Sequence, residues 1–182
     1  MYSAFFNRQP DSGGFVNSLE FNILCDSYGI SPGSLSSSGS SSFSAASNTL
    51  SPVSSLENSL LNAINSARSQ YGIGQLSLNP SLTGIARTRC TDMINRDYFS
   101  HNAPDGKNIF IILNEKGYGW QIAGENIYQC EPAGIGSGSA ILNTWMASPS
   151  HRENILNGAF SQAGIGIIDS QNTRTVSIVF SN

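Results

Sequence analysis

"AGIGIID" (residues 163–169) and "TVSIVFS" (residues 175–181) decide the fold, because apolar residues alternate with small or polar ones in both segments. Such alternation is typical of half-buried β-strands. The intervening "SQNTR" (residues 170–174) has the composition of a turn. The two segments therefore predict an antiparallel hairpin at the end of the chain.

A first helix is predicted far upstream of this hairpin. Ser54 and Glu57 have the spacing of a capping box, in which each side chain hydrogen-bonds the other residue's backbone N–H. Gly72 supplies a stop signal at the other end. Between these signals apolar residues recur at spacings of three and four, namely Leu56, Leu60, Ile64, Ala67 and Tyr71.

Three further helices are predicted from their end signals. Asn79 and Pro80 form the start of the second helix, and Asn108 caps the third. A fourth runs over residues 139–147 and ends before Pro149. The second helix has one apolar face, which consists of Leu82, Ala86, Cys90 and Met93. Helices followed by a closing hairpin predict an α+β fold, with an antiparallel sheet covered by helices.

Composition divides the chain into three parts. Thirteen serines occupy residues 31–55, and no charged residue lies between Asp26 and Glu57. Such a segment buries too little apolar surface to offset its ordering entropy, so residues 31–54 are expected to be a flexible linker. Residues 1–30 form an N-terminal segment of uncertain structure, and residues 55–182 form the predicted domain.

Charge and hydropathy argue against a nucleic acid partner and against a transmembrane segment. The formal net charge is −3, and no basic cluster is present, so no nucleic acid partner is expected. No apolar run approaches the ~20 residues that a transmembrane helix needs. No transmembrane segment is therefore expected. The predicted domain is also expected to be a monomer.

The three cysteines are Cys25, Cys90 and Cys130, and they are too far apart in sequence for a C-x-x-C zinc site. Cys90 is expected to point inward from the apolar face of its helix. If the chain is oxidised, Cys90 and Cys130 are predicted to pair and leave Cys25 free. Three unpaired thiols are the alternative.

Three titratable residues are candidates for a functional site: the two histidines, His101 and His151, and Glu125. Glu125 lies among apolar residues such as Ile122 and Tyr128, so its carboxylate should be desolvated and needs a cation, a metal or several donors. Two imidazoles and one carboxylate also form a set that suits zinc with one open position.

Each of these residues also has a simpler structural interpretation. His101 would be a solvated loop residue, and His151 would hydrogen-bond the loop before its helix. Glu125 would be a structural carboxylate satisfied by backbone N–H groups. Motifs for other enzymes are absent, since the chain has no G-x-S-x-G elbow, and "GIGSG" (residues 134–138) matches neither a P-loop nor a dinucleotide fingerprint.

Three ordered motifs resemble the bacterial form of the CAP superfamily, the SCP domain of cysteine-rich secretory proteins, antigen 5 and pathogenesis-related 1 proteins. The motifs are "YFSHNAPDGKN" (residues 98–108), "GYGWQIAGENIY" (117–128) and "ILNTWMASPSHRENILNGAFSQAGIGI" (141–167). The resemblance covers about residues 55–182. It implies an α-β-α sandwich with a central antiparallel sheet between helical layers.

The resemblance also implies a cleft where His101, Glu125 and His151 converge. Eukaryotic members complete a tetrad with a second glutamate, three residues after the helix tryptophan. This chain has Ser148 at that position. The loss of one anionic ligand should weaken any divalent metal site there.

The function implied is a noncatalytic binding module for a small apolar ligand or a cell-envelope component. A zinc-dependent hydrolase that uses the same cleft and a structural surface protein are the alternatives. Family members in bacteria are exported or surface-attached, so this chain is expected outside the cell or on its surface. Residues 1–14 lack the apolar run of a secretory signal.

Overall fold

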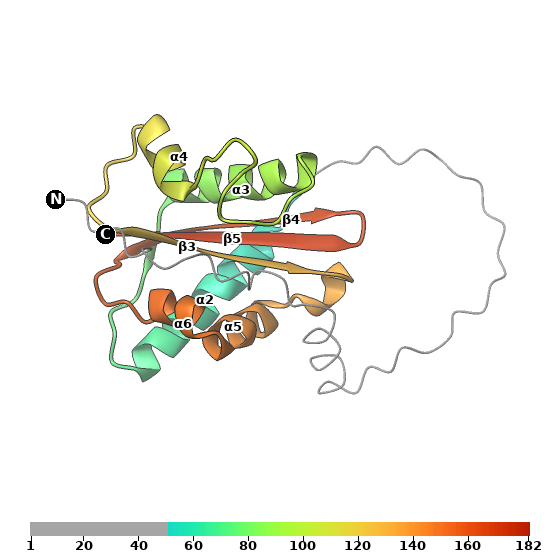
Figure 1. The fold of residues 1–182 in the computed structure, drawn as a ribbon. Coiled ribbons are helices and arrows are strands. Elements are labelled where there is room, and N and C mark those ends of the chain that lie inside the picture. Colours follow the sequence, from blue (N-terminus) through green and yellow to red (C-terminus); the bar gives the residue numbers. More distant parts are fainter. Residues whose placement is uncertain (1–50) are drawn as a thin grey trace, which may run out of the picture.

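A twisted sheet, antiparallel except for one short parallel pairing, lies between two layers of helices in the computed structural model (Figure 1). The structure describes residues 51–182. The expectations for Cys25, for residues 1–30 and for most of the linker lie outside the described residues. The predicted α-β-α sandwich is confirmed, and residues 51–182 form it.

The predicted closing hairpin is confirmed, and it lies at the centre of the sheet, where both of its strands are buried along most of their length. Strands β4 and β5 pair antiparallel, with Ile165 opposite Ile178, and Gln171 in the turn adopts a positive φ of 55°. Strand β3 pairs with the other edge of β5, and β1 and β2 pair with β4. The strands are β1 (Ser51–Pro52), β2 (Ser77–Leu78), β3 (Ala123–Cys130), β4 (Gln162–Ser170) and β5 (Thr173–Ser181).

The helices cover both faces of this sheet (Figure 1). One layer contains α3 (Pro80–Asn95) and α4 (Ile109–Glu115). The other contains α2 (Ser54–Gln70), α5 (Gly138–Ala147) and α6 (Pro149–Ile155). Among residues 51–182, none of the helices combines the length and apolar character that a membrane span requires.

Two predicted helix starts are confirmed. The side chain of Asn79 accepts hydrogen bonds from the backbone N–H groups of Ser81 and Leu82, and Pro80 is the first residue of α3. Asn108 caps α4 in the same way. Each cap satisfies N–H groups that have no partner inside the helix.

The predicted capping box at Ser54 is wrong. Val53 is the residue before α2, and it makes no side-chain cap. The carboxylate of Glu57 instead binds the guanidinium of Arg87 and accepts the backbone N–H of Ile167. Contacts of Glu57 with α3 and β4 have therefore replaced the predicted contact with the start of its own helix. The apolar stripe of α2 also ends early, because Tyr71 is 60% exposed.

The predicted pairing of Cys90 with Cys130 is also wrong. Both thiols are free and buried, and they belong to different apolar clusters. Cys90 packs with Met93 and Ile127 on the α3 side of the sheet, whereas Cys130 packs with Trp145 on the side of α2 and α5. The sheet lies between them, so no disulfide can form without rebuilding the core.

Helix α3 packs directly on the backbone of β4, and two glycines permit this approach. A Cβ atom added at Gly164 would lie 2.0 Å from the carbonyl carbon of Leu82 and 2.1 Å from the amide nitrogen of Thr83. At Gly166 it would lie 2.4 Å from the carbonyl carbon of Ala86. The small residues of the "AGIGI" segment are thus the contact surface for α3.

Arg68 joins the end of α2 to the chain that follows α6, although its side chain is almost fully buried. Its guanidinium donates to the backbone carbonyls of Gly74, Ile155, Asn157 and Phe160, at 2.7 to 2.9 Å. Burial lowers the pKa of this guanidinium. The charge is therefore held by carbonyl dipoles at the end of a helix, a favourable place for a cation.

Candidate functional site

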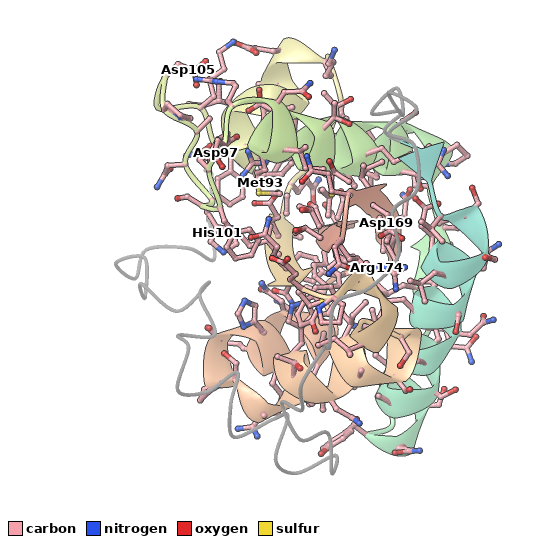
Figure 2. The ribbon with its side chains drawn as sticks, turned by 90° about the vertical axis from the view of Figure 1, so that its right-hand side faces the viewer. Met93, Asp97, His101, Asp105, Asp169 and Arg174 are labelled. Atoms are coloured by element: carbon pink, nitrogen blue, oxygen red, sulfur yellow. The ribbon has the colours of Figure 1, made fainter. Side chains whose placement is uncertain are left out.

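The candidate residues come from three separate parts of the fold. His101 lies in the loop between α3 and α4, and Figure 2 shows it together with Asp97 on that loop. Glu125 is the third residue of β3, and His151 lies in the first turn of α6. Ser148 is the residue between α5 and α6.

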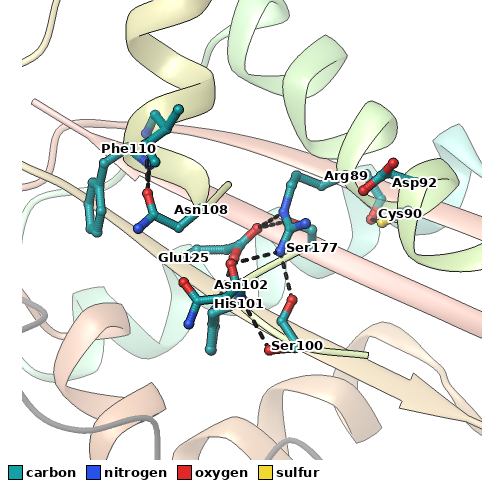
Figure 3. A network of polar contacts seen from close by, with 12 residues as sticks. Arg89, Cys90, Asp92, Ser100, His101, Asn102, Asn108, Phe110, Glu125 and Ser177 are labelled. Atoms are coloured by element: carbon teal, nitrogen blue, oxygen red, sulfur yellow. Dashed lines mark hydrogen bonds and ion pairs between the residues drawn. The ribbon is translucent and has the colours of Figure 1, made fainter. Parts of the chain in front are cut away.

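Glu125 is the centre of a buried polar network (Figure 3). Its side chain is 2% exposed. Oε1 accepts from Arg89 Nε at 3.0 Å and from Ser177 Oγ at 3.1 Å, and Oε2 lies 2.9 Å from His101 Nδ1. Glu125 thus has the desolvated position and the cation expected from its sequence context. Its partners are side chains, so the simpler interpretation through backbone N–H groups is wrong.

The partners of Glu125 lower its pKa by more than burial raises it. Burial alone raises the pKa of a carboxyl group, because it disfavours the charged form. Here the hydrogen bond from His101 and the charge of Arg89 together hold the pKa of Glu125 below its ordinary value of 4.5. The group is therefore a carboxylate at neutral pH.

Arg89 also holds the loop that carries His101. Besides Glu125, its guanidinium donates to the hydroxyl of Tyr98 at 2.7 Å and to the carbonyls of Ser100 at 2.8 Å and His101 at 3.2 Å. Its side chain is 1% exposed. One arginine on α3 thus connects the loop, the helix and β3.

His151 is placed by a different set of contacts. Its ring Nδ1 lies 2.8 Å from Ser148 Oγ. Its backbone carbonyl accepts from Asn126 Nδ2 at 3.1 Å, and Asn154 Nδ2 donates to Asn126 Oδ1 at 2.8 Å. The bond to Ser148 matches the simpler interpretation of His151 as a residue that anchors the preceding loop. The amide pair of Asn126 and Asn154 fixes α6 on the sheet.

Adjacent residues of β3 therefore contact the two histidines from opposite faces of the sheet. Successive side chains of a strand point to opposite faces. Glu125 points to the α3 layer, where it meets His101, and Asn126 points to the α6 layer, where it meets the backbone of His151. The "GEN" motif thus links both halves of the site.

The fold lowers the pKa of His151. The pKa of His151 falls from 6.5 to about 4, mainly because the ring is buried and secondly because a charge on His101 would repel it. Its imidazole is therefore neutral at physiological pH. A charged ring would be both desolvated and repelled.

We expect stability to depend on His151 between pH 6.5 and about 4. The folded pKa is the lower one, so the unfolded chain takes up a proton in this range that the folded domain excludes. The contribution is full above pH 6.5 and is lost as the pH falls, by roughly 3 kcal/mol in total. Urea unfolding of the wild type and His151→Gln at several pH values measures it. The gap between the two curves should change with pH, and parallel curves would contradict the prediction.

The described contacts of the Glu125 carboxylate are with protein side chains. Both oxygens of Glu125 already accept hydrogen bonds from Arg89, Ser177 and His101. Across the described part of the chain, no group of three or more His, Cys, Asp or Glu side chains is arranged to hold a metal ion. Glu125 therefore orients His101 through Oε2.

Four residues of this network were missed from the sequence: Arg89, Asn126, Asn154 and Ser177. Arg89 alone carried a usable signal. It lies between Ala86 and Met93 on the apolar face of α3, where a charged residue needs a buried partner. The contact of Ser177 with Glu125 carried no such signal, because it depends on the register in which β3 and β5 pair.

A hollow of about 230 Å³ lies between α3, the His101 loop and α4. Its charged groups are mostly paired with one another. Arg96 contacts Asp92 and Asp105, and Lys107 contacts Glu115. These pairs are exposed, so they leave the hollow without a buried group that lacks a partner.

Comparison with known proteins gives a consistent family. Residues 61–181 match the cysteine-rich secretory protein family, CAP. The chain is 32% identical over 120 residues to the uncharacterized protein YkwD of Bacillus subtilis, a match that covers 66% of this chain and 45% of that protein. The uncharacterized membrane protein YlbC of the same organism is 28% identical over 111 residues and is covered over 31% of its length. This chain thus spans less than half the length of these relatives.

Solved structures agree with the fold. An extracellular protein containing a SCP domain from Bacillus anthracis is similar with a TM-score of 0.63 and 27% identity, over 71% of this chain and 41% of that one. An outer surface protein of Borrelia burgdorferi has a TM-score of 0.68 at 14% identity, over 75% of this chain and 98% of that one. At that identity the second likeness concerns the fold alone.

Proposed function

This chain belongs to the cysteine-rich secretory protein (CAP) family, and from that premise we propose that it is a noncatalytic binding module for a component of the cell envelope. Its binding site is formed by His101, Glu125, His151 and Ser148. The observation that carries this proposal is that the carboxylate of Glu125 is buried and bonded to side chains of the protein. Its charge is neutralised by Arg89, and its oxygens are occupied within the protein.

The described nucleophiles also favour binding over catalysis. Ser148 contacts His151, but a histidine with a pKa of about 4 is a weak base for activating a hydroxyl. Burial raises the pKa values of the Cys90 and Cys130 thiols, which keeps both protonated. A reactive cysteine needs the opposite shift.

The polar character of the site favours an envelope component over a small apolar ligand. Ser100, Asn102, Ser148 and Ser150 flank the two histidines in sequence, and they supply hydroxyl and amide groups suited to sugars or peptides. The proposed location is outside the cell or on its surface. It is supported by the similar structure described as an extracellular protein containing a SCP domain.

Sedimentation with purified peptidoglycan sacculi of Bacillus subtilis tests this function. We expect the wild-type protein to pellet with the sacculi and the double variant His101→Asn/His151→Gln to bind at least tenfold less. Arg152→Gln is the matched control, because Arg152 is exposed and adjacent to His151. Circular dichroism should show that all three proteins are folded.

Two other results would refute the proposal in different ways. If the wild type stays in the supernatant but binds a fluorescent fatty acid, the ligand is apolar. If it binds neither probe, the structural surface role becomes the better explanation. The zinc hydrolase alternative requires stoichiometric zinc after dialysis against the metal, lost in His101→Ala, which elemental analysis measures directly.

A further inference from the structure

The direction of each hydrogen bond around Glu125 is determined by chemistry. A guanidinium has only donors, and a carboxylate has only acceptors. Arg89 Nε therefore donates to Oε1, and His101 Nδ1, at 2.9 Å from Oε2, must also be the donor. A neutral imidazole carries one ring proton, so Nε2 of His101 is then the nitrogen without a proton.

We infer that Glu125 determines which ring nitrogen of His101 carries the proton, and that Arg89 is the positioning residue that fixes the orientation of the Glu125 side chain. Arg89 holds Oε1 of Glu125 on the side away from the histidine. Ser177 donates to the same oxygen at 3.1 Å, but a hydroxyl can turn and accept instead. Arg89 cannot reverse its role, and neither can the carboxylate of Glu125, so the bonds from Arg89 and from His101 both have a fixed direction.

The network that surrounds Arg89 makes this direction rigid. Its guanidinium is anchored by Tyr98 and by the carbonyls of Ser100 and His101, so it cannot swing away when its partner changes. The same contacts place the His101 backbone relative to Glu125. The arginine thus helps to position the ring, and Glu125, which the arginine orients, sets the tautomer.

This inference deepens the proposed function, and its consequence for the ligand rests on that function. A neutral His101 meets any group at Nε2 as a hydrogen-bond acceptor. The ligand group that contacts it there must be a donor, such as a hydroxyl or an amide N–H. A carbonyl or carboxylate oxygen would be repelled by the Nε2 lone pair.

Glu125→Gln gives a sharp test because it keeps the shape of the side chain. Arg89 can bind only the oxygen of the new amide, so the amide NH₂ must face His101 Nδ1. Nδ1 then has to accept, and the ring proton moves to Nε2. The tautomer of His101 should therefore be inverted relative to the wild type.

Two-dimensional ¹H–¹⁵N NMR of the imidazole rings measures this without any ligand, at a pH where the spectrum shows neutral rings. Protonated and unprotonated ring nitrogens have widely separated ¹⁵N shifts, and His151→Gln assigns the two histidines. We expect Nδ1–H in the wild type and Nε2–H in Glu125→Gln. Glu115→Gln is the matched control, because Glu115 is exposed on α4 and pairs with Lys107, so the wild-type pattern should remain.

The double variant Glu125→Gln/Arg89→Met tests the role of Arg89 itself. Both buried charges are removed together, so neither is left uncompensated. The amide is then free to turn its oxygen to His101, and the Nδ1–H form should return at least in part. An Nδ1–H ring in Glu125→Gln, or the same Nε2–H ring in both variants, would overturn the inference. A failure to bind sacculi would leave it intact.

Discussion

Gly164→Ala is expected to prevent stable folding of the domain, with a loss of at least about 4–5 kcal/mol in the free energy of unfolding. The new Cβ would lie 2.0 Å from the carbonyl carbon of Leu82 and 2.1 Å from the amide nitrogen of Thr83. These are backbone atoms of α3, so no side chain can move aside to relieve the clash. The helix would have to lift off the sheet, and Leu82 would lose its buried position.

The measurement is urea unfolding followed by circular dichroism, with soluble yield as a first indication. Gly84→Ala is the matched control, since Gly84 lies on the same helix, is exposed to solvent and has open space where a Cβ would lie. Alanine there should stabilise the domain by about 0.5–1 kcal/mol through helix propensity. Similar effects of the two substitutions would refute the close approach of α3 to β4.

The second large effect is expected for Arg68→Met, which should lower the free energy of unfolding by about 3–5 kcal/mol. Two of its acceptors, the carbonyls of Ile155 and Phe160, are buried, and each costs about 1–3 kcal/mol when it has no partner. Methionine fills similar space but offers no donor. The region between α6 and β4 should therefore open first.

Chemical denaturation gives the total loss, and hydrogen exchange locates it. Arg152→Met is the control, because Arg152 is exposed on α6 and its substitution should change stability by less than about 0.5 kcal/mol. Arg68→Lys should fall between the two, since an ammonium can reach fewer of the carbonyls. If Arg68→Met unfolds at the same urea concentration as Arg152→Met, the four carbonyl bonds contribute little.

Periodicity made much of the fold predictable. The hairpin showed alternation over both of its strands, and Asn79 and Asn108 marked helix starts by a local mechanism that tertiary contacts left intact. Strand β3 was not predicted from periodicity. Both of its faces are covered by helices, so nearly all of its residues are buried and the polar alternation of a half-exposed strand is missing.

The site was predictable as a set of residues but not as a set of contacts. The desolvation of Glu125 followed from its apolar neighbours, and so did its need for a cation. The identity of that cation did not, because Arg89 lies 36 residues away and meets Glu125 only through the packing of α3 on the sheet. The failed capping box has the same cause, since Glu57 found partners on α3 and β4.

The link from Glu125 and Asn126 to opposite layers has a consequence for how this site can evolve. Glu125 and Asn126 are adjacent in β3. Their contacts therefore set the separation between the loop that carries His101 and the helix that carries His151. This separation cannot widen without breaking the contacts that hold the loop and α6 to β3. Sequence changes that preserve both contacts are therefore expected in the segments outside them.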